Sequence, residues 1–337
     1  MKLLVTGGAG FIGSAFIRRI LSRDSDARII NLDKLTYAGN LENLVSVKDH
    51  AGYRFVHGDI CDQLLVERLI VEDGAEAIVH FAAESHVDRS IHAPAPVFET
   101  NLRGTFSLLE AARAQRVKRF VHVSTDEVYG SIDLPAEADE TFPLRPSSPY
   151  SAAKAGSDLL ALSYFTTYKQ PVMVTRASNN YGPFQFPEKL IPLMISRALD
   201  GQPLPVYGDG RQVRDWLYVE DHCAAIEAVL QKGREGQVYN IGGNRSLENI
   251  TVVERILAGT GQLPNLIQYV ADRPGHDRRY ALSSEKMERE TGWKPEMDFE
   301  SGLSRTIAWY QDHADWVGRI KSGEYQQFYQ LNYGSRT

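Results

Sequence analysis

The chain has 337 residues, enough for two packed lobes with separate cores. Its composition, 43% apolar and 24% charged, is typical of a globular protein, and a run of about 18 apolar residues that would predict a membrane span is absent. A net charge of −6 without a basic block argues against a nucleic-acid surface. Cys61 and Cys223 are expected to be reduced packing residues, and the first residues lack a signal-peptide pattern, which favours a cytoplasmic enzyme.

The first half of the chain alternates short apolar runs with helical patterns. Strands are expected at Lys2–Thr6, Arg28–Leu32, Tyr53–Val56, Ala77–Phe81, Arg119–Val123 and Val172–Thr175. Helices are expected at Gly13–Arg23, Leu64–Glu72, Asn101–Arg113 and Tyr150–Tyr168. Near-continuous apolar strands that alternate with helices predict an α/β fold with a parallel, doubly wound Rossmann sheet.

The pattern changes after about residue 179, where turn residues gather in Asn179–Pro183 and Tyr207–Gly210. Shorter elements follow, with helices expected near Lys189–Asp200 and Val219–Gln231 and a strand near Val238–Ile241. We therefore expect a first domain over residues 1–178 and a smaller α/β lobe over residues 179–337 that interleaves with it.

A glycine-rich turn, Gly7–Gly13, connects the first expected strand to the first helix. Glycines at positions 7, 10 and 13 allow a sharp turn and close approach of the backbone to a pyrophosphate, and the helix N-terminus offers N–H donors. Asp33 follows about 20 residues on and would accept hydrogen bonds from the adenosine ribose hydroxyls, which favours NAD over NADP. The sequence therefore predicts an NAD-binding first domain; a tight turn without a ligand is the alternative.

Tyr150 and Lys154 form a Y-x-x-x-K pair at the start of an expected helix. Their i, i+4 spacing places both side chains on one face of that helix. A nearby ammonium, together with a positively charged nicotinamide ring, would favour the phenolate of Tyr150, so that it could take a proton from a sugar hydroxyl. The pair predicts an oxidation step in the first domain.

Two adjacent carboxylates, Asp126 and Glu127, follow Ser124 and Thr125 at the end of an expected strand. Two carboxyl groups at one strand end suit general acid and general base roles when their environments separate their pKa values. The alternative is that Asp126 caps the next turn and Glu127 is solvated.

These motifs resemble the extended short-chain dehydrogenase/reductase family and, within it, the dTDP-glucose 4,6-dehydratase branch. The likeness covers nearly the whole chain, and the segments that carry it are Gly7–Gly13, His80–Ser90, Ser124–Gly130, Tyr150–Lys154, Asn179–Pro183, Pro187–Pro192 and Asp272–Asp277. Epimerases and decarboxylases of the family generally lack an acid at the position of Asp126.

The resemblance implies conversion of dTDP-glucose to dTDP-4-keto-6-deoxyglucose and water, with NAD kept bound throughout. Tyr150 would deprotonate the C4 hydroxyl while hydride moves to NAD, Glu127 would remove the C5 proton, and Asp126 would protonate the departing C6 hydroxyl. Hydride would then return to C6. The catalytic residues implied are Thr125, Asp126, Glu127, Tyr150 and Lys154.

The resemblance also implies two sets of binding residues. The cofactor would be contacted by Gly7, Gly10, Phe11, Ile12, Gly13, Asp33, Lys34, Leu35, Thr36, Asp59, Ile60, Phe81, Ala82, Ala83, Ser85, Thr100, Tyr150, Lys154 and Asn180. The nucleotide sugar would be contacted by Ser85, Thr125, Asn179, Lys189, Leu190, Pro205, Val206, Tyr207, Arg214, Asn249, Asp272, Arg273 and His276.

The sequence also bears on a metal site and on the oligomeric state. His80, His86 and His122 lack the spacing of metal ligands, so a metal site is not expected. The resemblance implies a homodimer packed through the helices expected at Asn101–Arg113 and Tyr150–Tyr168. The apolar residues of these helices beyond one core face are Phe106, Leu109, Leu159, Leu162 and Phe165, for which burial within the lobe is the alternative.

Three other functions stay open at this point. An epimerase or decarboxylase of the same fold would share the glycine turn and the Tyr150/Lys154 pair. A 4,6-dehydratase could act on a UDP-sugar, because one methyl group distinguishes thymidine from uridine and is worth about 1–3 kcal/mol in an apolar pocket. A nucleotide-binding protein without catalysis is the third alternative.

Overall fold

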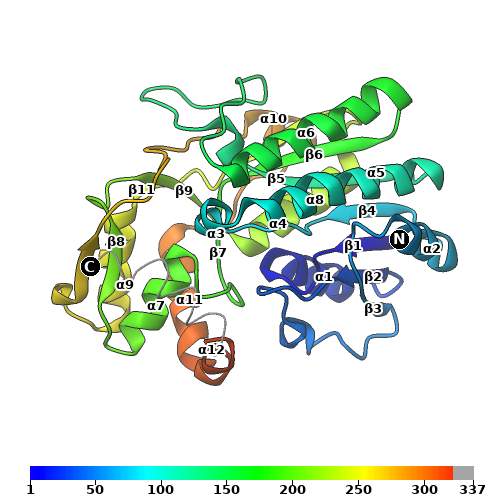
Figure 1. Cartoon of the computed structure of the whole chain (residues 1–337). Helices are drawn as coiled ribbons and strands as arrows, with labels where there is room; N and C mark the ends of the chain where they lie inside the picture. Colours follow the sequence, from blue (N-terminus) through cyan, green and yellow to red (C-terminus); the bar gives the residue numbers. More distant parts are fainter. Residues whose placement is uncertain (322–337) are drawn as a thin grey trace.

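The larger lobe is built on a seven-stranded parallel sheet (Figure 1) in the computed structural model, which describes residues 1–321. The strands are β1 (Lys2–Thr6), β2 (Arg28–Asp33), β3 (Tyr53–His57), β4 (Ala77–His80), β5 (Arg119–Thr125), β6 (Val172–Ala177) and β10 (Val238–Ile241). Their order is β10-β6-β5-β4-β1-β2-β3, and every neighbouring pair is parallel. The predicted doubly wound parallel sheet is confirmed.

Helices cover both faces of this sheet because successive residues of its strands are apolar. On β1, Leu3 and Val5 belong to the core beneath α1 and α8, whereas Leu4 belongs to the core beneath α2, α5 and α6. The helices of this lobe are α1 (Phe11–Arg23), α2 (Gln63–Asp73), α3 (Val87–His92), α4 (Pro94–Phe98), α5 (Thr105–Ala114), α6 (Pro149–Tyr168), α8 (Val219–Lys232) and α10 (Glu285–Thr291). A wider helical turn, Glu99–Gly104, leads directly into α5.

The smaller lobe lies beside the sheet on the left of Figure 1 and has its own core. Its strands are β7 (Asn179–Tyr181), β8 (Leu204–Tyr207), β9 (Val213–Tyr218), β11 (Ser246–Glu248) and β12 (Ile267–Val270). They form a three-stranded sheet, β11-β9-β7, and a pair, β12-β8. Its helices are α7 (Leu190–Leu199), α9 (Asn249–Thr260), α11 (Phe299–Asp312) and α12 (Ala314–Ile320).

The chain returns to the large sheet after entering the smaller lobe. Strand β10 pairs in parallel with β6, α8 packs on α1, and α10 packs on β10 and α8, so these elements lie in the larger lobe although they follow residue 179. A strand's apolar run does not reveal which sheet it joins, since that depends on a partner far away in the sequence. The exact bounds of the two domains stay a prediction.

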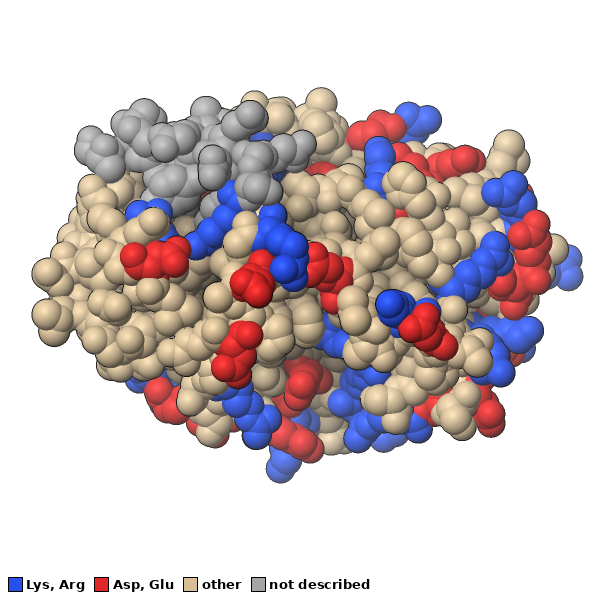
Figure 2. All heavy atoms as spheres, turned by 90° about the horizontal axis from the view of Figure 1, so that it is seen from below, with Lys and Arg blue, Asp and Glu red and all other residues tan. Residues whose placement is uncertain are grey.

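Charged side chains of both signs are interspersed on the face seen in Figure 2. Among residues 1–321, none of the helices combines the length and apolar character needed to cross a bilayer.

Candidate active site

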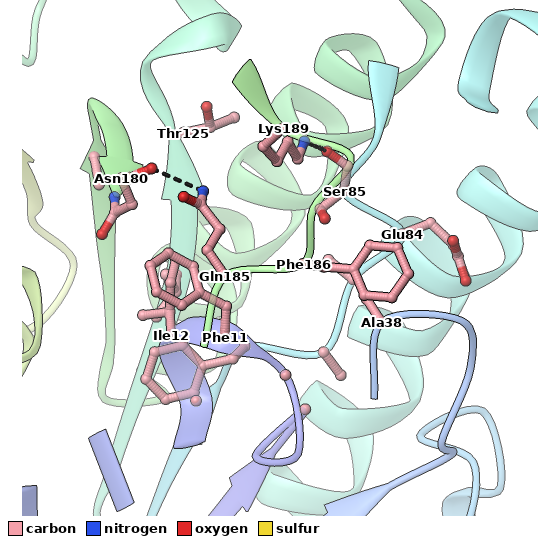
Figure 3. A pocket seen from close by; sticks show the side chains of 18 of the residues that line it. Phe11, Ile12, Ala38, Glu84, Ser85, Thr125, Asn180, Gln185, Phe186 and Lys189 are labelled. Carbon is pink, nitrogen blue, oxygen red and sulfur yellow. Dashed lines mark hydrogen bonds between the residues drawn. The ribbon is translucent and has the colours of Figure 1, made fainter. Parts of the chain in front are cut away.

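All strands of the large sheet point the same way, so their carboxyl ends share one edge, where ligands of open α/β sheets bind. A cavity of about 320 Å³ lies along this edge. The turns after β1, β2, β4, β5 and β6 line one side, and residues 185–191 of the smaller lobe line the other. Figure 3 shows a contact between the lobes, in which Lys189 Nζ donates to the Ser85 carbonyl oxygen, and a contact within the smaller lobe, in which Gln185 Nε2 donates to the carbonyl oxygen of Asn180.

The glycine-rich turn leaves space that a side chain would fill. Gly7 has a φ of +71°, and a Cβ atom there would lie 2.5 Å from the backbone nitrogen of Ala82. A Cβ on Gly13 would lie 2.3 Å from the carbonyl oxygen of Gly7. Helix α1 begins at Phe11 with neither a side-chain cap nor an acidic residue in its first turn. Its first N–H groups are therefore available to an anion, and the residues present fit the pyrophosphate of a dinucleotide.

Asp33 ends β2 and is held by backbone donors. Its Oδ2 accepts from the N–H of Ala9 and its Oδ1 from the N–H of Leu35, each at 2.8 Å. Burial raises the pKa of Asp33, and the two N–H groups oppose that rise. Close by, Lys34 Nζ lies 2.7 Å from Asp59 Oδ2. The carboxylate of Asp33 lines the cavity at the end of β2, where a partner for the adenosine ribose is expected.

Tyr150 and Lys154 lie on the first turns of α6, which begins with Pro149 after a capping box between Ser148 and Ser151. Both side chains are buried and line the cavity. Lys154 Nζ donates to the carbonyl oxygen of Val123 at 2.8 Å, which joins α6 to β5. Burial lowers the pKa of Lys154 to about 8, and the charge of Asp158 opposes that shift.

The pKa of Tyr150 moves opposite to the direction expected from Lys154. Burial raises it, and the nearby carboxyl groups of Glu127 and Asp126 raise it further. In the protein alone, burial and the nearby carboxyl groups therefore favour the neutral phenol. A phenolate at this site needs a further positive charge in the cavity, which the oxidised nicotinamide ring carries.

Asp126 and Glu127 form the start of a short helical turn, Asp126–Tyr129, directly after β5. Thr125 organises this turn: its Oγ1 donates to Asp126 Oδ1 and accepts from the N–H of Glu127, each at 3.2 Å. Asp126 Oδ2 is buried without a hydrogen-bond partner among residues 1–321. Both carboxyl groups line the cavity that Tyr150 also faces.

The two carboxyl groups have different surroundings. Burial and the charge of Glu127 raise the pKa of Asp126 well above its usual value. Burial also raises the pKa of Glu127, but the cations of Arg273, Lys189 and Arg214 oppose the rise. The surroundings therefore separate the two carboxyl groups, with Asp126 the better placed to hold a proton and Glu127 the better placed to lose one, as the roles of acid and base require.

Nearly all of the predicted cofactor residues line this cavity, whereas of the predicted substrate residues only Ser85, Thr125, Asn179, Lys189 and Leu190 do. Of the predicted cofactor contacts, Leu35 alone does not line it. The predicted substrate contacts outside it are Pro205, Val206, Tyr207, Arg214, Asn249, Asp272, Arg273 and His276. Pro205 and Val206 are both buried in the smaller lobe, and the side chain of Val206 packs in its core.

Within that second group, Arg214 and Arg273 lie close enough for their charges to act on Glu127, and Tyr207, Asp272 and His276 lie beside them. Arg214 lies over the ring of Tyr280, with 4.2 Å from its guanidinium carbon to the ring centre, and its charge acts on the carboxyl groups of Asp126 and Glu127. Arg273 Nη1 lies 3.8 Å from Asp88 Oδ1. Asp272 Oδ1 lies 2.6 Å from His276 Nδ1, and burial lowers the pKa of His276 to about 4. The buried guanidinium group of Arg214 and the partly exposed one of Arg273, both close enough for their charges to act on Glu127, suit the diphosphate of a nucleotide sugar.

Several cavity residues were missed by sequence reasoning. They include Gln185, Phe186, Glu188, Trp216 and His222. Glu188 Oε2 lies 3.2 Å from Arg89 Nε, and burial raises the pKa of Glu188 to about 7. Glu188 lies inside one of the segments that carry the family likeness, but nothing in the sequence pairs it with a residue about a hundred positions earlier.

A metal site was not expected from the sequence. Among residues 1–321, no three His, Cys, Asp or Glu side chains are grouped so that they could hold a metal ion. His80 and His122 instead take part in hydrogen bonds with Thr105 and Ser157 in the core of the larger lobe.

A dinucleotide cradle and a Tyr/Lys pair on one parallel sheet define an enzyme of the short-chain dehydrogenase/reductase class. The model of the GDP-mannose 4,6 dehydratase family matches residues 4–306, and the chain belongs to this family. The dTDP-glucose 4,6-dehydratase of Shigella flexneri is 50% identical to it over 361 aligned positions, covering 100% of each protein.

Solved structures agree with that placement. A dTDP-glucose 4,6-dehydratase from Streptomyces venezuelae, crystallised with NAD, superposes with a TM-score of 0.93 at 51% identity, covering 95% of this chain and 100% of that one. A UDP-glucose 4-epimerase from Thermus thermophilus, also in complex with NAD, superposes with a TM-score of 0.86 at 33% identity, covering 93% of this chain and 100% of that one. The fold is therefore shared with epimerases, and the site has to distinguish the reactions.

Proposed function

We propose that this chain is an NAD-dependent dTDP-glucose 4,6-dehydratase, a hydro-lyase that forms dTDP-4-keto-6-deoxyglucose and water. The observation that carries the proposal is the pair Asp126 and Glu127, one buried and one partly exposed carboxyl group with different surroundings in the cavity that holds Tyr150 and Lys154. Oxidation at one carbon needs the Tyr/Lys pair. Elimination of water from the adjacent carbons needs an acid and a base as well.

Tyr150 is the residue that takes the proton of the C4 hydroxyl. Lys154 holds a positive charge one helical turn away and stabilises the phenolate that Tyr150 must become. When bound, NAD supplies the hydride acceptor for this oxidation and later the hydride donor at C6, so it ends each turnover as it began. Thr125 orients Asp126 and Glu127 through its hydroxyl group.

Glu127 is assigned as the base for C5, because the cations of Arg273, Lys189 and Arg214 oppose the rise that burial causes in its pKa. The 4-keto group makes the C5 proton acidic, and Glu127 removes it. Asp126 donates its proton to the C6 hydroxyl, which leaves as water. Return of hydride to C6 and of the proton from Glu127 to C5 completes the product, and Asp126 recovers its proton from Tyr150 through solvent. Protons and electrons then balance over the cycle.

The cluster around Arg214 and Arg273 is proposed to hold the diphosphate of the substrate, and Tyr207 and Asn249 to lie near the nucleoside. Asn249 Oδ1 is buried and has no partner among residues 1–321, which leaves it as an acceptor. Lys189 and Asn179 line the cavity together with Glu127. Asn179 Oδ1 is also without a partner in the described part of the chain.

The competing functions give different products. An epimerase or decarboxylase does not need an acid directed at C6, so Asp126 argues against both. A protein that has lost catalysis would not retain Asp126, Glu127, Tyr150 and Lys154 in one cavity. A panel of dTDP-, UDP-, CDP- and GDP-hexoses, with detection of the keto sugar and of a mass loss of one water, distinguishes these possibilities and identifies the nucleotide.

The decisive experiment replaces the two carboxyl groups separately, as Asp126→Asn and Glu127→Gln. Each variant should retain bound NAD and lose about 10²–10⁴-fold in turnover of dTDP-glucose. Asp133→Asn, at an exposed loop position, is the control and should turn over at the original rate. Nearly full turnover by both variants would refute the assignment.

A homodimer packed through α5 and α6 is proposed, although fewer of the five apolar residues are exposed than the sequence predicted. Leu109 is fully buried in the chain's own core, and Leu162 and Phe165 are partly buried, so they do not form a free face. Phe106 and Leu159 are 44% and 58% exposed. Leu159→Glu should convert a dimer to a monomer in light scattering, whereas Leu263→Glu in the smaller lobe should not; a monomeric parent protein would overturn the proposal.

A cytoplasmic location also stays a prediction. Its support is that Cys61 and Cys223 are both free cysteines, as expected where thiols are kept reduced.

A further inference from the structure

His222 is a buried cavity residue to which neither the sequence motifs nor the proposed mechanism gives a role. It lies in the first turn of α8, is 1% exposed and lines the cavity. The next residue, Cys223, directs its thiol toward the carbonyl oxygen of Ile12 at 3.7 Å, so the start of α8 lies against the glycine-rich turn. His222 is therefore placed beside the cofactor cradle.

One hydrogen bond fixes the position of the proton on the imidazole ring. His222 Nδ1 lies 2.8 Å from Asn180 Oδ1. The amide of Asn180 is oriented by its Nδ2, which donates to the carbonyl oxygen of Ser178 at 2.9 Å. Because an amide oxygen only accepts, His222 has to donate from Nδ1. In the neutral ring, Nε2 then carries a lone pair and no proton.

That lone pair is the unexplained feature. His222 Nε2 is buried and has no hydrogen-bond partner among residues 1–321. Burial lowers the pKa of His222 to about 3, so a second proton does not occupy Nε2 near neutral pH. A buried acceptor without a donor is unfavourable, and such groups in folded proteins usually have a partner. The cavity that His222 lines is the place from which a donor can come.

The order of the strands tells which end of a dinucleotide meets His222. Asp33, the partner expected for the adenosine ribose, ends β2, whereas Asn180 follows β6 on the other side of β1, β4 and β5. Asp126 and Glu127, which follow β5, lie on the same side of β1 as Asn180. A dinucleotide that spans this edge brings the carboxamide N–H₂ and ribose hydroxyls of its nicotinamide half to β6. A neutral imidazole suits that end, since an imidazolium would repel the oxidised nicotinamide ring.

We propose that His222 is a cofactor-binding residue that accepts, at Nε2, a hydrogen bond from an N–H or O–H donor of the nicotinamide riboside half of NAD, while its Nδ1–H holds Asn180 in position. The inference rests on the proposed NAD-dependent function and adds a residue to that site. It also assigns Asn180 a partner: the amide that the family likeness places beside the cofactor is oriented by His222 on one side and by Ser178 on the other.

His222→Asn separates the two ring nitrogens. The amide nitrogen of Asn replaces Nδ1 as a donor to Asn180, and the acceptor at Nε2 is lost. The parent protein and the variant are freed of cofactor, and the dissociation constants of NAD, ADP and 3-acetylpyridine adenine dinucleotide are measured by tryptophan fluorescence. The last of these carries a methyl ketone in place of the carboxamide and so lacks its N–H donors.

The variant should bind NAD about tenfold more weakly, the loss expected for one neutral hydrogen bond, and should bind ADP as the parent does. If the donor is the carboxamide, the acetylpyridine analogue should bind both proteins alike; if it is a ribose hydroxyl, the analogue should lose as much affinity as NAD. Unchanged NAD affinity, or an equal loss for ADP, would overturn the inference. A parent protein that binds no NAD would instead refute the proposed function, so the two failures are distinguishable.

Discussion

Lys154 lies between the sheet and a buried ion pair: its Nζ donates to the carbonyl oxygen of Val123 at 2.8 Å, and Asp158 follows one turn later on the same face of α6. Asp158 Oδ2 in turn accepts from Arg176 Nε at 2.8 Å, and His122 Nε2 lies 3.3 Å from Asp158 Oδ1. All of these side chains are buried. The positive charge beside Tyr150 is therefore supported by a carboxylate that does not line the cavity.

This relationship predicts the alkaline pH dependence of turnover. Burial lowers the pKa of Lys154 to about 8, and Asp158 is the one charge that opposes the shift. Lys154 is charged below its pKa, so turnover should fall as pH rises through about 8. In Asp158→Asn the opposing charge is gone, the pKa of Lys154 is lower, and the fall should begin at a lower pH. The measurement is kcat against pH for the parent and the variant.

The control has to weaken the buried network without changing the charge near Lys154. Tyr129→Phe does so, because Tyr129 accepts from Arg176 Nη1 at 2.9 Å and donates to Asn240 Oδ1 at 2.8 Å. This variant should lose stability and keep the parent's pH profile, and Asp158→Glu should restore part of the profile. An alkaline limb that is the same in Asp158→Asn and the parent would show that Asp158 has only a structural role.

Asp126 should limit the stability of the fold. Burial and the charge of Glu127 raise its pKa well above the usual value, so the folded protein binds this proton more tightly than the unfolded chain. Stability is then lost as pH rises from the unfolded pKa, about 3.9, through the folded one. Asp126→Asn cannot ionise and should gain about 1 kcal/mol in the free energy of unfolding at neutral pH, while losing activity.

Asp158→Asn should change the free energy of unfolding in the direction opposite to Asp126→Asn. Burial raises the pKa of Asp158, but the hydrogen bond from His122 and the charge of Arg176 outweigh burial and leave it lowered. Its ionised form therefore stabilises the fold above the unfolded pKa, and the Asn variant should unfold at lower denaturant concentration at neutral pH. Urea titrations of both cofactor-free variants should move in opposite directions; a loss of stability in Asp126→Asn would contradict the argument.

Two glycines of the same turn should respond differently to an added methyl group. A Cβ on Gly7 would lie 2.5 Å from the Ala82 nitrogen at a φ of +71°, whereas one on Gly10 would lie 3.3 Å from its nearest neighbour, the Gly7 carbonyl oxygen. Gly7→Ala should therefore destabilise the cofactor-free protein by at least about 1–2 kcal/mol. Gly10→Ala should fold nearly as well but bind NAD more weakly, because the methyl group would lie where the pyrophosphate approaches. Thermal unfolding and NAD titration separate the two effects.

Features that depend on residues close together in the sequence were predicted, whereas features that depend on distant residues were not. The glycine turn, the Tyr150/Lys154 pair and the Asp126/Glu127 pair each lie within a few residues, so their spacing determines their geometry. Strand β10 could not be assigned to the large sheet from its own four residues, because its partner β6 is about sixty positions earlier.

Long-range pairing also explains the residues that were missed or misjudged. The role of His222 depends on its hydrogen bond with Asn180, which lies far away in the sequence. Leu109 and Phe106 are both apolar residues of one helix, but Leu109 is buried and Phe106 is 44% exposed. The pKa of Tyr150 depends on how completely the folded site excludes water, which spacing along a helix does not reveal.

Asp33 should determine the choice between NAD and NADP. Its two carboxylate oxygens accept from the N–H groups of Ala9 and Leu35, so the side chain is held in place at the end of β2. A 2′-phosphate on the adenosine ribose would meet this carboxylate, and juxtaposed like charges cost several kcal/mol. Asp33→Ser removes the charge and should raise the ratio of NADP to NAD affinity by about tenfold or more. NAD should bind more weakly because its ribose loses a partner, and NADP should bind more tightly because the repulsion of its 2′-phosphate is removed. Asp59→Asn, which removes the partner of Lys34, should change both affinities alike, and calorimetric titration of each dinucleotide into each variant would decide. An unchanged ratio in Asp33→Ser would mean that the selectivity lies elsewhere in the adenosine half of the cavity.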